Sequence, residues 1–415
     1  MGGWWRRSAA ALGLGCLLMS GGAALRGADW PAFRGGAMQG LVTERGLPTK
    51  WDAKTGANVI WTAKLPKSDQ PFSSPIVSNG KLFLTYTLAA SREHHVLCLD
   101  PADGKTLWDT KIEPGPWKLT DLRGGYNAPT PAADGAHVFA VFGSAVVASL
   151  DFTGKVVWRK ELDDHAFDVA LGTSPVLYKD TVLLQCDLTD KKSSLLALRK
   201  DTGEIAYREP RPEVNFSHGT PALVEIGGAN QLLVSASNRL QGVDPATGKV
   251  IWFCASKGDA VGPVYGGGLV YVDDGRGAPG MAVDPTGKGD VTATHIKWKY
   301  KESLPEGIST PLIVGDYIYR VTKPATVHCI ELKTGKSMYE ERIDGLSTWS
   351  SPVATPEGNV YFCNGGKSFV VKAGPTYELV ATNDLGDANV GPSPAVAGGR
   401  IFIRGMMQLF CIGAK

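Results

Sequence analysis

Few residues in this chain are spaced for catalysis or metal binding. The adjacent His94 and His95 could supply imidazole ligands, but the seven histidines are scattered and no third ligand stands at a metal-binding spacing. The run Asp273-Asp274-Gly275-Arg276 resembles the start of a calcium loop and lacks the later oxygen ligands, so it predicts a charged hairpin tip. Neither a GxSxG sequence nor a plausible order of triad residues occurs. What the chain can do therefore depends on the elements that position its side chains.

A repeated turn phrase dominates the sequence. An acidic residue near the end of a hydrophobic strand is followed by a glycine turn, and an aromatic residue stands four positions after the glycine. The clearest copies are LDPADGKTLW (99–108), LDFTGKVVW (150–158), LRKDTGEIAY (198–207), VDPATGKVIW (243–252) and IELKTGKSMY (330–339). Because each unit of such a repeat buries its hydrophobic face against its neighbours, the pattern predicts a repeat architecture.

A second phrase gives the number of units. A small residue and a proline precede each hydrophobic hairpin, at Pro75, Pro131, Pro175, Pro221, Pro263, Pro311, Pro352 and Pro394. These eight prolines are spaced by about 46 residues on average, which is typical of four-stranded propeller blades. In the sixth unit the predicted strands are Thr310–Val314, Tyr317–Thr322, Thr326–Leu332 and Ser337–Ile343. Helical periodicity is absent from the sequence after residue 30.

The two ends of the chain complement each other. The last unit ends at Lys415 without an outer strand, whereas Asn58–Leu65 has the pattern of an outer strand, with Trp61 in the aromatic position. We expect this N-terminal strand to complete the last blade, since an open ring would leave an unpaired edge. The predicted fold class is all-β: one eight-bladed β-propeller of four-stranded antiparallel blades over residues 29–415.

Charge and hydropathy exclude two classes of function. A net charge of +2 gives no electrostatic signature for nucleic acid, and no stretch after residue 30 is apolar enough to span a bilayer. Residues 1–28 have the pattern of a signal peptide, with a positive Arg6-Arg7 region before an apolar stretch. We expect a periplasmic or secreted protein that begins near Asp29. An incomplete twin-arginine pattern at Arg6-Arg7 is an alternative reading of the export signal, and an incomplete lipoprotein pattern at Cys16 leaves a lipid-anchored form as a minor alternative.

Six of the seven cysteines follow the signal peptide, in a compartment that permits disulfides. Cys98, Cys329 and Cys411 occupy the same position in different units, and Cys186 and Cys363 share another. Equivalent positions in separate blades point into separate interfaces, so we expect buried free thiols.

The phrase D-x-x-T-G-K-x-x-W, with the S-x-P strand before it, resembles the pyrroloquinoline quinone (PQQ) type propeller repeat of quinoprotein dehydrogenases and BamB-type outer-membrane assembly lipoproteins. The opening DWPAFRGGAMQGLVTERGLPTKWDAKTGANVIWTAKLP (29–66) is similar to the start of secreted PQQ-like propellers. The resemblance covers nearly all of residues 29–415, and its motifs are specific for fold and weak for activity. It implies that the strand-four tryptophans pack between blades: Trp61, Trp108, Trp158, Trp252 and Trp298.

The resemblance implies two possible functions. In quinoprotein dehydrogenases PQQ carries the redox step, while the protein supplies calcium, an aspartate and a stacking tryptophan. This chain lacks the adjacent cysteine pair of many such enzymes, and it is shorter and lacks their long inserts. We therefore expect a non-enzymatic binding or scaffold module of the cell envelope without a cofactor or metal. The alternative is a PQQ-dependent dehydrogenase that acts on an alcohol or sugar and uses PQQ with calcium.

A ligand is expected on the ring face where the loop before each blade's first strand and the loop between its second and third strands approach the axis. Large polar or aromatic residues in these loops are Arg123, Tyr126 and Asn127 from the insertion 113–127, with His218, Arg276, Arg320, Trp349 and Arg404. Each of them could instead stabilise its own loop. We expect Arg276, Arg320 and Arg404 to form an exposed positive funnel, which would favour a small anionic ligand or an acidic loop of a protein partner. We expect the protein to be a monomer.

Overall fold

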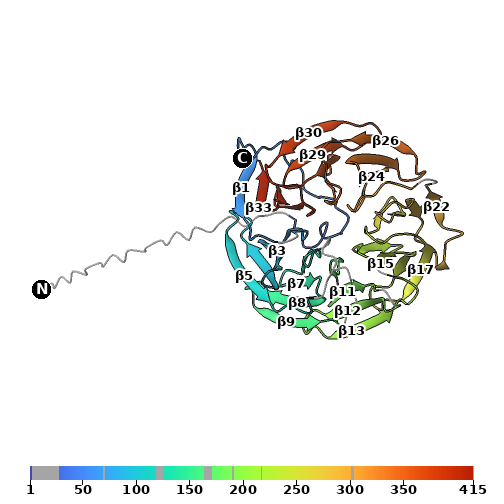
Figure 1. Ribbon diagram of the computed structural model, residues 1–415, viewed down its shortest axis with the longest axis horizontal. Helices are drawn as coiled ribbons and strands as arrows, with labels where there is room; N and C mark the ends of the chain where they lie inside the picture. The colour runs from blue at the N-terminus through green and yellow to red at the C-terminus, as the bar shows by residue number, and fades with distance from the viewer. Residues whose placement is uncertain are drawn as a thin grey trace.

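The computed structural model describes Met1 and residues 28–68, 71–117, 125–162, 171–188, 191–215, 217–300 and 303–414. This part of the chain forms strands β1 to β33 and contains no helix. The strands make eight sheets, seven of four strands and one of five. The sheets stand around a central axis as the blades of a propeller (Figure 1). The predicted all-β, eight-bladed propeller is confirmed.

We number the blades in chain order. Blades 1 and 2 contain β2 (Ile76–Ser78), β3 (Lys81–Leu88), β4 (Glu93–Leu99) and β5 (Thr106–Ile112), then β6 (Ala132–Ala133), β7 (His137–Phe142), β8 (Val146–Asp151) and β9 (Val156–Glu161). Blades 3 and 4 contain β10 (Val176–Tyr178), β11 (Thr181–Cys186), β12 (Ser194–Arg199) and β13 (Ile205–Pro210), then β14 (Ala222–Ile226), β15 (Ala229–Ala236), β16 (Arg239–Val243) and β17 (Val250–Ala255).

Blades 5 and 6 contain β18 (Val264–Gly266), β19 (Leu269–Val272), β20 (Met281–Val283) and β22 (Ile296–Lys299), then β23 (Leu312–Val314), β24 (Tyr317–Thr322), β25 (Thr326–Glu331) and β26 (Ser337–Arg342). Blade 7 contains β27 (Val353–Ala354), β28 (Asn359–Phe362), β29 (Lys367–Lys372) and β30 (Leu379–Asp384), and blade 8 contains β31 (Ala395–Ala397), β32 (Arg400–Arg404), β33 (Gln408–Gly413) and β1 (Val59–Lys64).

The N-terminal strand β1 closes the ring. It pairs antiparallel with β33, with Trp61 opposite Cys411 and Lys64 opposite Gln408. Figure 1 shows the two strands side by side at the point where the chain begins and ends its circuit. The predicted closure is confirmed, and β33 has no unpaired edge.

The repeat residues join neighbouring blades. A Cβ atom at Gly154 of blade 2, where φ is +91°, would lie 2.7 Å from the indole of Trp108 in blade 1. The Trp108 Nε1 donates a hydrogen bond to the Phe152 carbonyl at 3.0 Å. Equivalent contacts join Trp61 to the turn of Gly104, Trp158 to that of Gly203, Tyr207 to that of Gly248 and Trp298 to that of Gly335. The expected packing of these tryptophans between blades is confirmed.

Trp252 shows a variant of this packing. It is buried in the cluster between blades 4 and 5, but its Nε1 donates to Gln231 Oε1 of its own blade at 2.9 Å. Strand β21 (Gly289–Asp290), which leads to β22, pairs in parallel with β17 and covers the outer edge of blade 4. Blade 4 therefore forms the five-stranded sheet.

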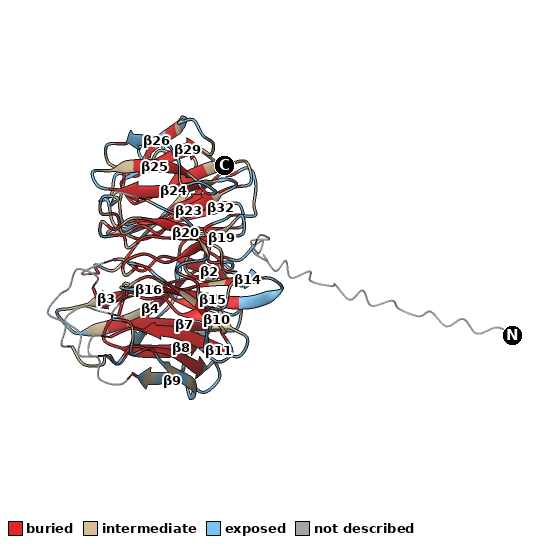
Figure 2. Cartoon of the chain, turned by 90° about the vertical axis from the view of Figure 1, so that its right-hand side faces the viewer, coloured by how far each residue is buried: buried red, intermediate tan, exposed pale blue. Residues whose placement is uncertain are grey.

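Burial follows the position of each strand in its blade. The inner strands are filled with buried residues, whereas most residues of an outer strand such as β9 are exposed or half-buried (Figure 2). The cysteines of the described chain are all buried thiols outside disulfides, as expected: Cys98, Cys186, Cys254, Cys329, Cys363 and Cys411. The expected signal peptide and Cys16 fall on residues outside the described part of the chain. Within the described residues, no helix could cross a membrane.

Candidate functional site at the propeller axis

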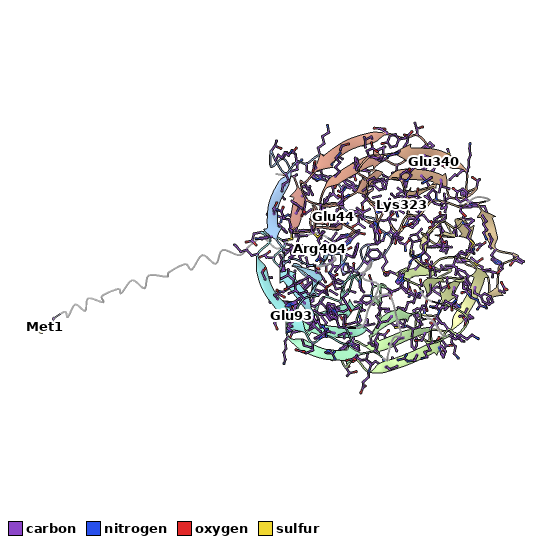
Figure 3. The ribbon with its side chains drawn as sticks, in the orientation of Figure 1. Met1, Glu44, Glu93, Lys323, Glu340 and Arg404 are labelled. Carbon is purple, nitrogen blue, oxygen red and sulfur yellow. The ribbon has the colours of Figure 1, made fainter. Side chains whose placement is uncertain are left out.

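Residues 28–58, which we call the N-terminal segment, cross one face of the ring. They hydrogen-bond to the first strand or first turn of several blades, and Figure 3 places Glu44 well inside the outline of the ring. The contacts join Trp30 to Val77, Pro31 to Ala133, Gln39 to Tyr265, Val42 to Ala354 and Glu44 to Gly398. Val77, Ala133, Ala354 and Gly398 stand at or beside the turn between the first and second strands, so the segment lies on the face of the ring where these turns are.

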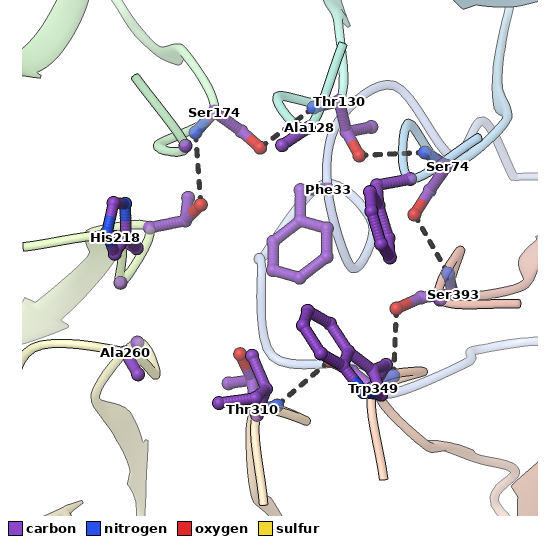
Figure 4. Close-up of a pocket in the computed structure, with 18 of the residues that line it drawn as sticks. Phe33, Ser74, Ala128, Thr130, Ser174, His218, Ala260, Thr310, Trp349 and Ser393 are labelled. Atoms are coloured by element: carbon purple, nitrogen blue, oxygen red, sulfur yellow. Dashed lines mark hydrogen bonds between the residues drawn. The ribbon is translucent and has the colours of Figure 1, made fainter. Parts of the chain in front are cut away.

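The residues that precede the eight prolines form a ring at the axis. Seven of them carry a hydroxyl group, and we call these the hydroxyl belt: Ser74, Thr130, Ser174, Thr220, Thr310, Ser351 and Ser393. The backbone N–H of one belt residue donates to the hydroxyl oxygen of the next, as from Ser74 to Thr130 Oγ1 at 3.0 Å. Five further links of 2.9 to 3.0 Å extend this chain from Thr310 to Thr220 (Figure 4). The belt therefore joins blades close to the axis.

Gly262 interrupts the belt in blade 5. A Cβ atom at Gly262 would lie 2.4 Å from the Thr220 carbonyl oxygen, and a Cβ atom at Gly219 would lie 2.4 Å from that of Val261. No side chain fits at these distances. Direct contact between the backbones of blades 4 and 5 replaces the missing hydroxyl.

A cavity of about 290 Å³ lies on the axis, and all eight blades contribute to its lining. The hydroxyl belt lines its wall, and Phe33 of the N-terminal segment lies at its centre in Figure 4. The rings of Phe72 and Trp349 stack with centroids 5.2 Å apart, and Trp349 is 39 % exposed. A Cβ atom at Gly391 would lie 2.5 Å from Phe72, so glycine is needed for this aromatic pair.

The charged groups of the cavity are paired. Arg276, between β19 and β20, donates from Nε to Asp259 Oδ1 at 2.9 Å. Burial raises the pKa of the Asp259 carboxyl, and Arg276 partly opposes that shift. Glu306 pairs with Lys323 at 3.0 Å. These two pairs leave no excess charge among the four groups.

The predicted site residues divide into three groups. His218, Arg276 and Trp349 line the cavity. Tyr126 and Asn127 are buried: Tyr126 stacks on Trp117 at 3.8 Å, and Asn127 Nδ2 donates to Ser68 Oγ at 3.3 Å. Arg123 lies outside the described residues.

Arg320 and Arg404 are not exposed, so the expected positive funnel of three arginines is wrong. Arg320 is buried between blades 5 and 6, where its Nε and Nη2 donate to the two oxygens of Asp273 at 2.8 and 3.0 Å. Arg404 is buried between blades 8 and 1, where its Nη1 donates to the carbonyls of Ser73 and Thr85 at 2.7 and 2.9 Å. Both arginines belong to second strands, β24 and β32, rather than to the loops that follow. Strand side chains point to the two faces of a blade, and here these faces are buried.

Sequence reasoning missed Phe33, Phe72 and the hydroxyl belt. The belt has a sequence signal, because a hydroxyl residue precedes seven of the eight prolines. The two phenylalanines have none, because they lie in segments outside the turn and proline phrases.

The donor set of the cavity does not fit calcium-bound PQQ. A calcium ion takes six to eight oxygen ligands, several of them from carboxylates. Glu306 is the one carboxylate among the described residues that line the cavity, and it is paired with Lys323. Over the described chain, no group of three His, Cys, Asp or Glu side chains could hold a metal ion. Phe72 and Trp349 could contact a flat ligand, but the oxygen ligands for calcium are missing from this lining.

Comparisons with known proteins agree with the fold and identify the family. BamB from Moraxella catarrhalis is 13 % identical over 85 % of this chain and 99 % of its own, with a TM-score of 0.58. A europium-containing methanol dehydrogenase is 12 % identical over 91 % of this chain and 89 % of its own, with a TM-score of 0.65. The computationally designed protein Ika8 is 12 % identical over 86 % and 99 %, with a TM-score of 0.57.

These structural likenesses show the fold alone, since they extend from an assembly factor to a dehydrogenase and a designed protein. No curated protein sequence matches the chain. The family model described as outer membrane protein assembly factor BamB matches residues 92–341, more than half of the chain. The chain therefore belongs to the BamB-like family of PQQ-repeat β-propellers.

Proposed function

We propose that this protein is an exported, non-enzymatic binding module of the cell envelope that holds a small ligand, or the tip of a partner's loop, in its axial cavity. The observation that carries the proposal is a cavity lined by all eight blades, with Phe33 of the N-terminal segment and the partly exposed Trp349 in its lining. Its volume of about 290 Å³ is near the lower end of the range for ligand pockets. A small molecule or one large side chain fits this volume better than a long peptide does.

The envelope location rests on two observations. The family model that matches the chain is that of an outer-membrane assembly factor, and residues 1–28 have the pattern of a signal peptide. We also propose that the exported protein acts as a monomer, because a strand of the same chain completes the last blade.

A PQQ-dependent dehydrogenase is the second candidate, and the Phe72–Trp349 stack is the feature that favours it. The missing calcium ligands count against it. Titration of the protein with PQQ, with and without calcium, should therefore give no calcium-dependent change in tryptophan fluorescence. Reduction of an artificial electron acceptor by the loaded protein in the presence of alcohols or sugars would establish the enzyme instead.

A photo-crosslinking experiment tests the binding module. A photoreactive amino acid at position 349 should give a discrete adduct in cells that export the protein, because Trp349 lies in the cavity lining. The matched control is position 379, where Leu379 is 43 % exposed on the outer strand β30. Equal adducts at both positions, or none at position 349, would contradict a binding role for the cavity.

A further inference from the structure

We propose that the axial cavity selects a small organic anion with a carboxylate or phosphate group, and that the buried Arg34 and Arg404 provide the attraction. This inference rests on the proposed binding function and adds the chemical class of the ligand. It replaces the expected surface funnel with two charges inside the protein.

Arg34 directly follows Phe33, which lines the cavity. It is 2 % exposed, and its Nη2 donates to the Gln39 carbonyl at 3.0 Å. Its Nε and Nη1 are buried without a hydrogen-bond partner in the described chain. A Cβ atom at Gly40 would lie 2.8 Å from Arg34 Nη2, so glycine leaves the room that the guanidinium occupies. The described residues contain no ion pair to this group.

Arg404 is a second buried cation without a carboxylate. It is 1 % exposed, and Figure 3 places it inside the ring. Its Nη1 donates to the Ser73 carbonyl, one residue from Ser74 of the hydroxyl belt, while its Nε has no partner in the described chain. By contrast, Arg320 pairs with the buried Asp273, and Arg211 pairs with the buried Asp187. Of these four buried arginines, only Arg34 and Arg404 therefore add positive charge that no carboxylate compensates.

Both groups remain cationic near neutral pH. Burial lowers the pKa of Arg34 and of Arg404 to about 9, and no neighbouring charge contributes to either shift. A buried charge without a counterion is costly, and its field decays slowly in a medium of low dielectric constant. The Arg276–Asp259 and Glu306–Lys323 pairs cancel, so they do not offset the positive charge that Arg34 and Arg404 add.

The hydroxyl belt supplies donors for the oxygens of an anion. Six belt hydroxyls accept a backbone N–H, and in the described chain none of these six donates to a protein acceptor. Their O–H groups are thus available to a ligand in the cavity that they line. Carboxylate and phosphate oxygens accept several such bonds, and Phe72 and Trp349 can contact the apolar part of the ligand.

Matched aromatic probes separate charge from shape. Benzoate and phenyl phosphate are titrated against the mature protein at constant ionic strength, with benzamide as the neutral counterpart of benzoate. Binding is measured by calorimetry and by the fluorescence change that is lost in Trp349→Phe. We expect at least one anion to bind about tenfold or more tightly than benzamide. The two anions show whether the site prefers a carboxylate or a phosphate.

Arginine variants identify the source of the preference. Arg34→Gln and Arg404→Gln should each weaken anion binding and leave benzamide binding unchanged, while Arg34→Lys and Arg404→Lys should keep most of the anion preference. Arg45→Gln is the control, since Arg45 lies in the same segment with a 70 % exposed side chain. Thermal unfolding shows which variants fold. Where a glutamine variant does not fold, quenching by iodide and by caesium replaces it, with Trp349 isolated as the difference between the unchanged protein and Trp349→Phe. The ratio of iodide quenching to caesium quenching should exceed the ratio measured for free tryptophan.

The outcomes distinguish this inference from the function on which it rests. Equal binding of benzoate, phenyl phosphate and benzamide, or an iodide-to-caesium quenching ratio no higher than that of free tryptophan, would overturn the anion site and leave the cavity as a binding site. An anion preference that survives in both glutamine variants would overturn the assignment to Arg34 and Arg404. Failure of position 349 to crosslink in cells would instead count against the proposed function.

Discussion

The turn phrase gives each residue a separate structural task. In blade 2, Asp151 Oδ1 accepts hydrogen bonds from the Thr153 N–H at 2.8 Å and from the Lys155 N–H at 3.1 Å. The hydrogen bond from the Thr153 hydroxyl is the largest cause of the lowered pKa of Asp151. Gly154 then adopts a positive φ and makes room for Trp108 of the previous blade. The aspartate therefore stabilises the turn, and the glycine allows the tryptophan of the previous blade to pack against it.

A pair of glycine variants separates backbone strain from packing. Gly203 and Gly80 have φ values of +72° and +71°, so alanine is strained at both positions. A Cβ atom at Gly203 would lie 2.6 Å from Trp158, whereas nothing lies within 4 Å of one at Gly80. We expect Gly80→Ala to lower the free energy of unfolding by about 1 kcal/mol, and Gly203→Ala to lower it by about 2 kcal/mol more. Equal losses in chemical denaturation would show that the tryptophan contact does not restrict this position.

The positions of individual polar and aromatic side chains were harder to predict than the repeat. His218, Arg276 and Trp349 lie outside the strands and line the cavity. Arg320 and Arg404 were predicted to follow the second strands of their blades, but they lie inside these strands. Arg320 lies in the strand that was predicted as Tyr317–Thr322, so the strand bounds were right and the error was to assign a residue of this strand to the loop that follows it. Inside a strand its side chain points to a face of the blade, and that face is buried.

At the level of elements, the repeat made β1 predictable and left the rest of the N-terminal segment unpredicted. Asn58–Leu65 has the aromatic and hydrophobic pattern of an outer strand, and β1 takes that place. Residues before it match neither phrase, so their path across the ring has no periodic signal. Phe33, which lines the cavity, and the adjacent Arg34 both belong to this path.

Two deletions test the separate tasks of this region. Removal of residues 29–65 takes away β1 and leaves the edge of β33 unpaired, so we expect loss of cooperative unfolding and self-association. Removal of residues 29–57 keeps β1 and takes away Phe33 and Arg34, so the ring should stay closed while anion binding is lost. Denaturant unfolding and size-exclusion chromatography measure these effects. If the two deletion variants unfold alike, closure of the ring depends on the N-terminal segment rather than on β1.

At the scale of the whole molecule, ring closure determines how stability is distributed. An open array of repeats can unfold from its ends, because each terminal unit contacts only one neighbour. In this ring β1 completes blade 8, so every blade has two neighbours and none is terminal. Proteins of different function share this fold, so the fold explains stability and does not identify an activity.

The free thiols report whether the blades open one at a time. Cys98, Cys186, Cys254, Cys329, Cys363 and Cys411 are buried in six different blades. Burial raises the pKa of the Cys98 thiol to about 12, and it does the same for Cys411, so neither reacts without an opening of the structure. If closure makes opening global, all six thiols should be alkylated at one common rate, with one common dependence on denaturant.

Peptide mass spectrometry after pulsed alkylation measures the six rates. In the protein that lacks residues 29–65, Cys411 should react first, because Trp61 stands opposite it in the lost β1. Thiols of blades far from blade 8, such as Cys254 of blade 4, should follow later in that variant. Six staggered rates in the full-length protein would show that its blades open individually, and the ring would then be closed in geometry without being cooperative.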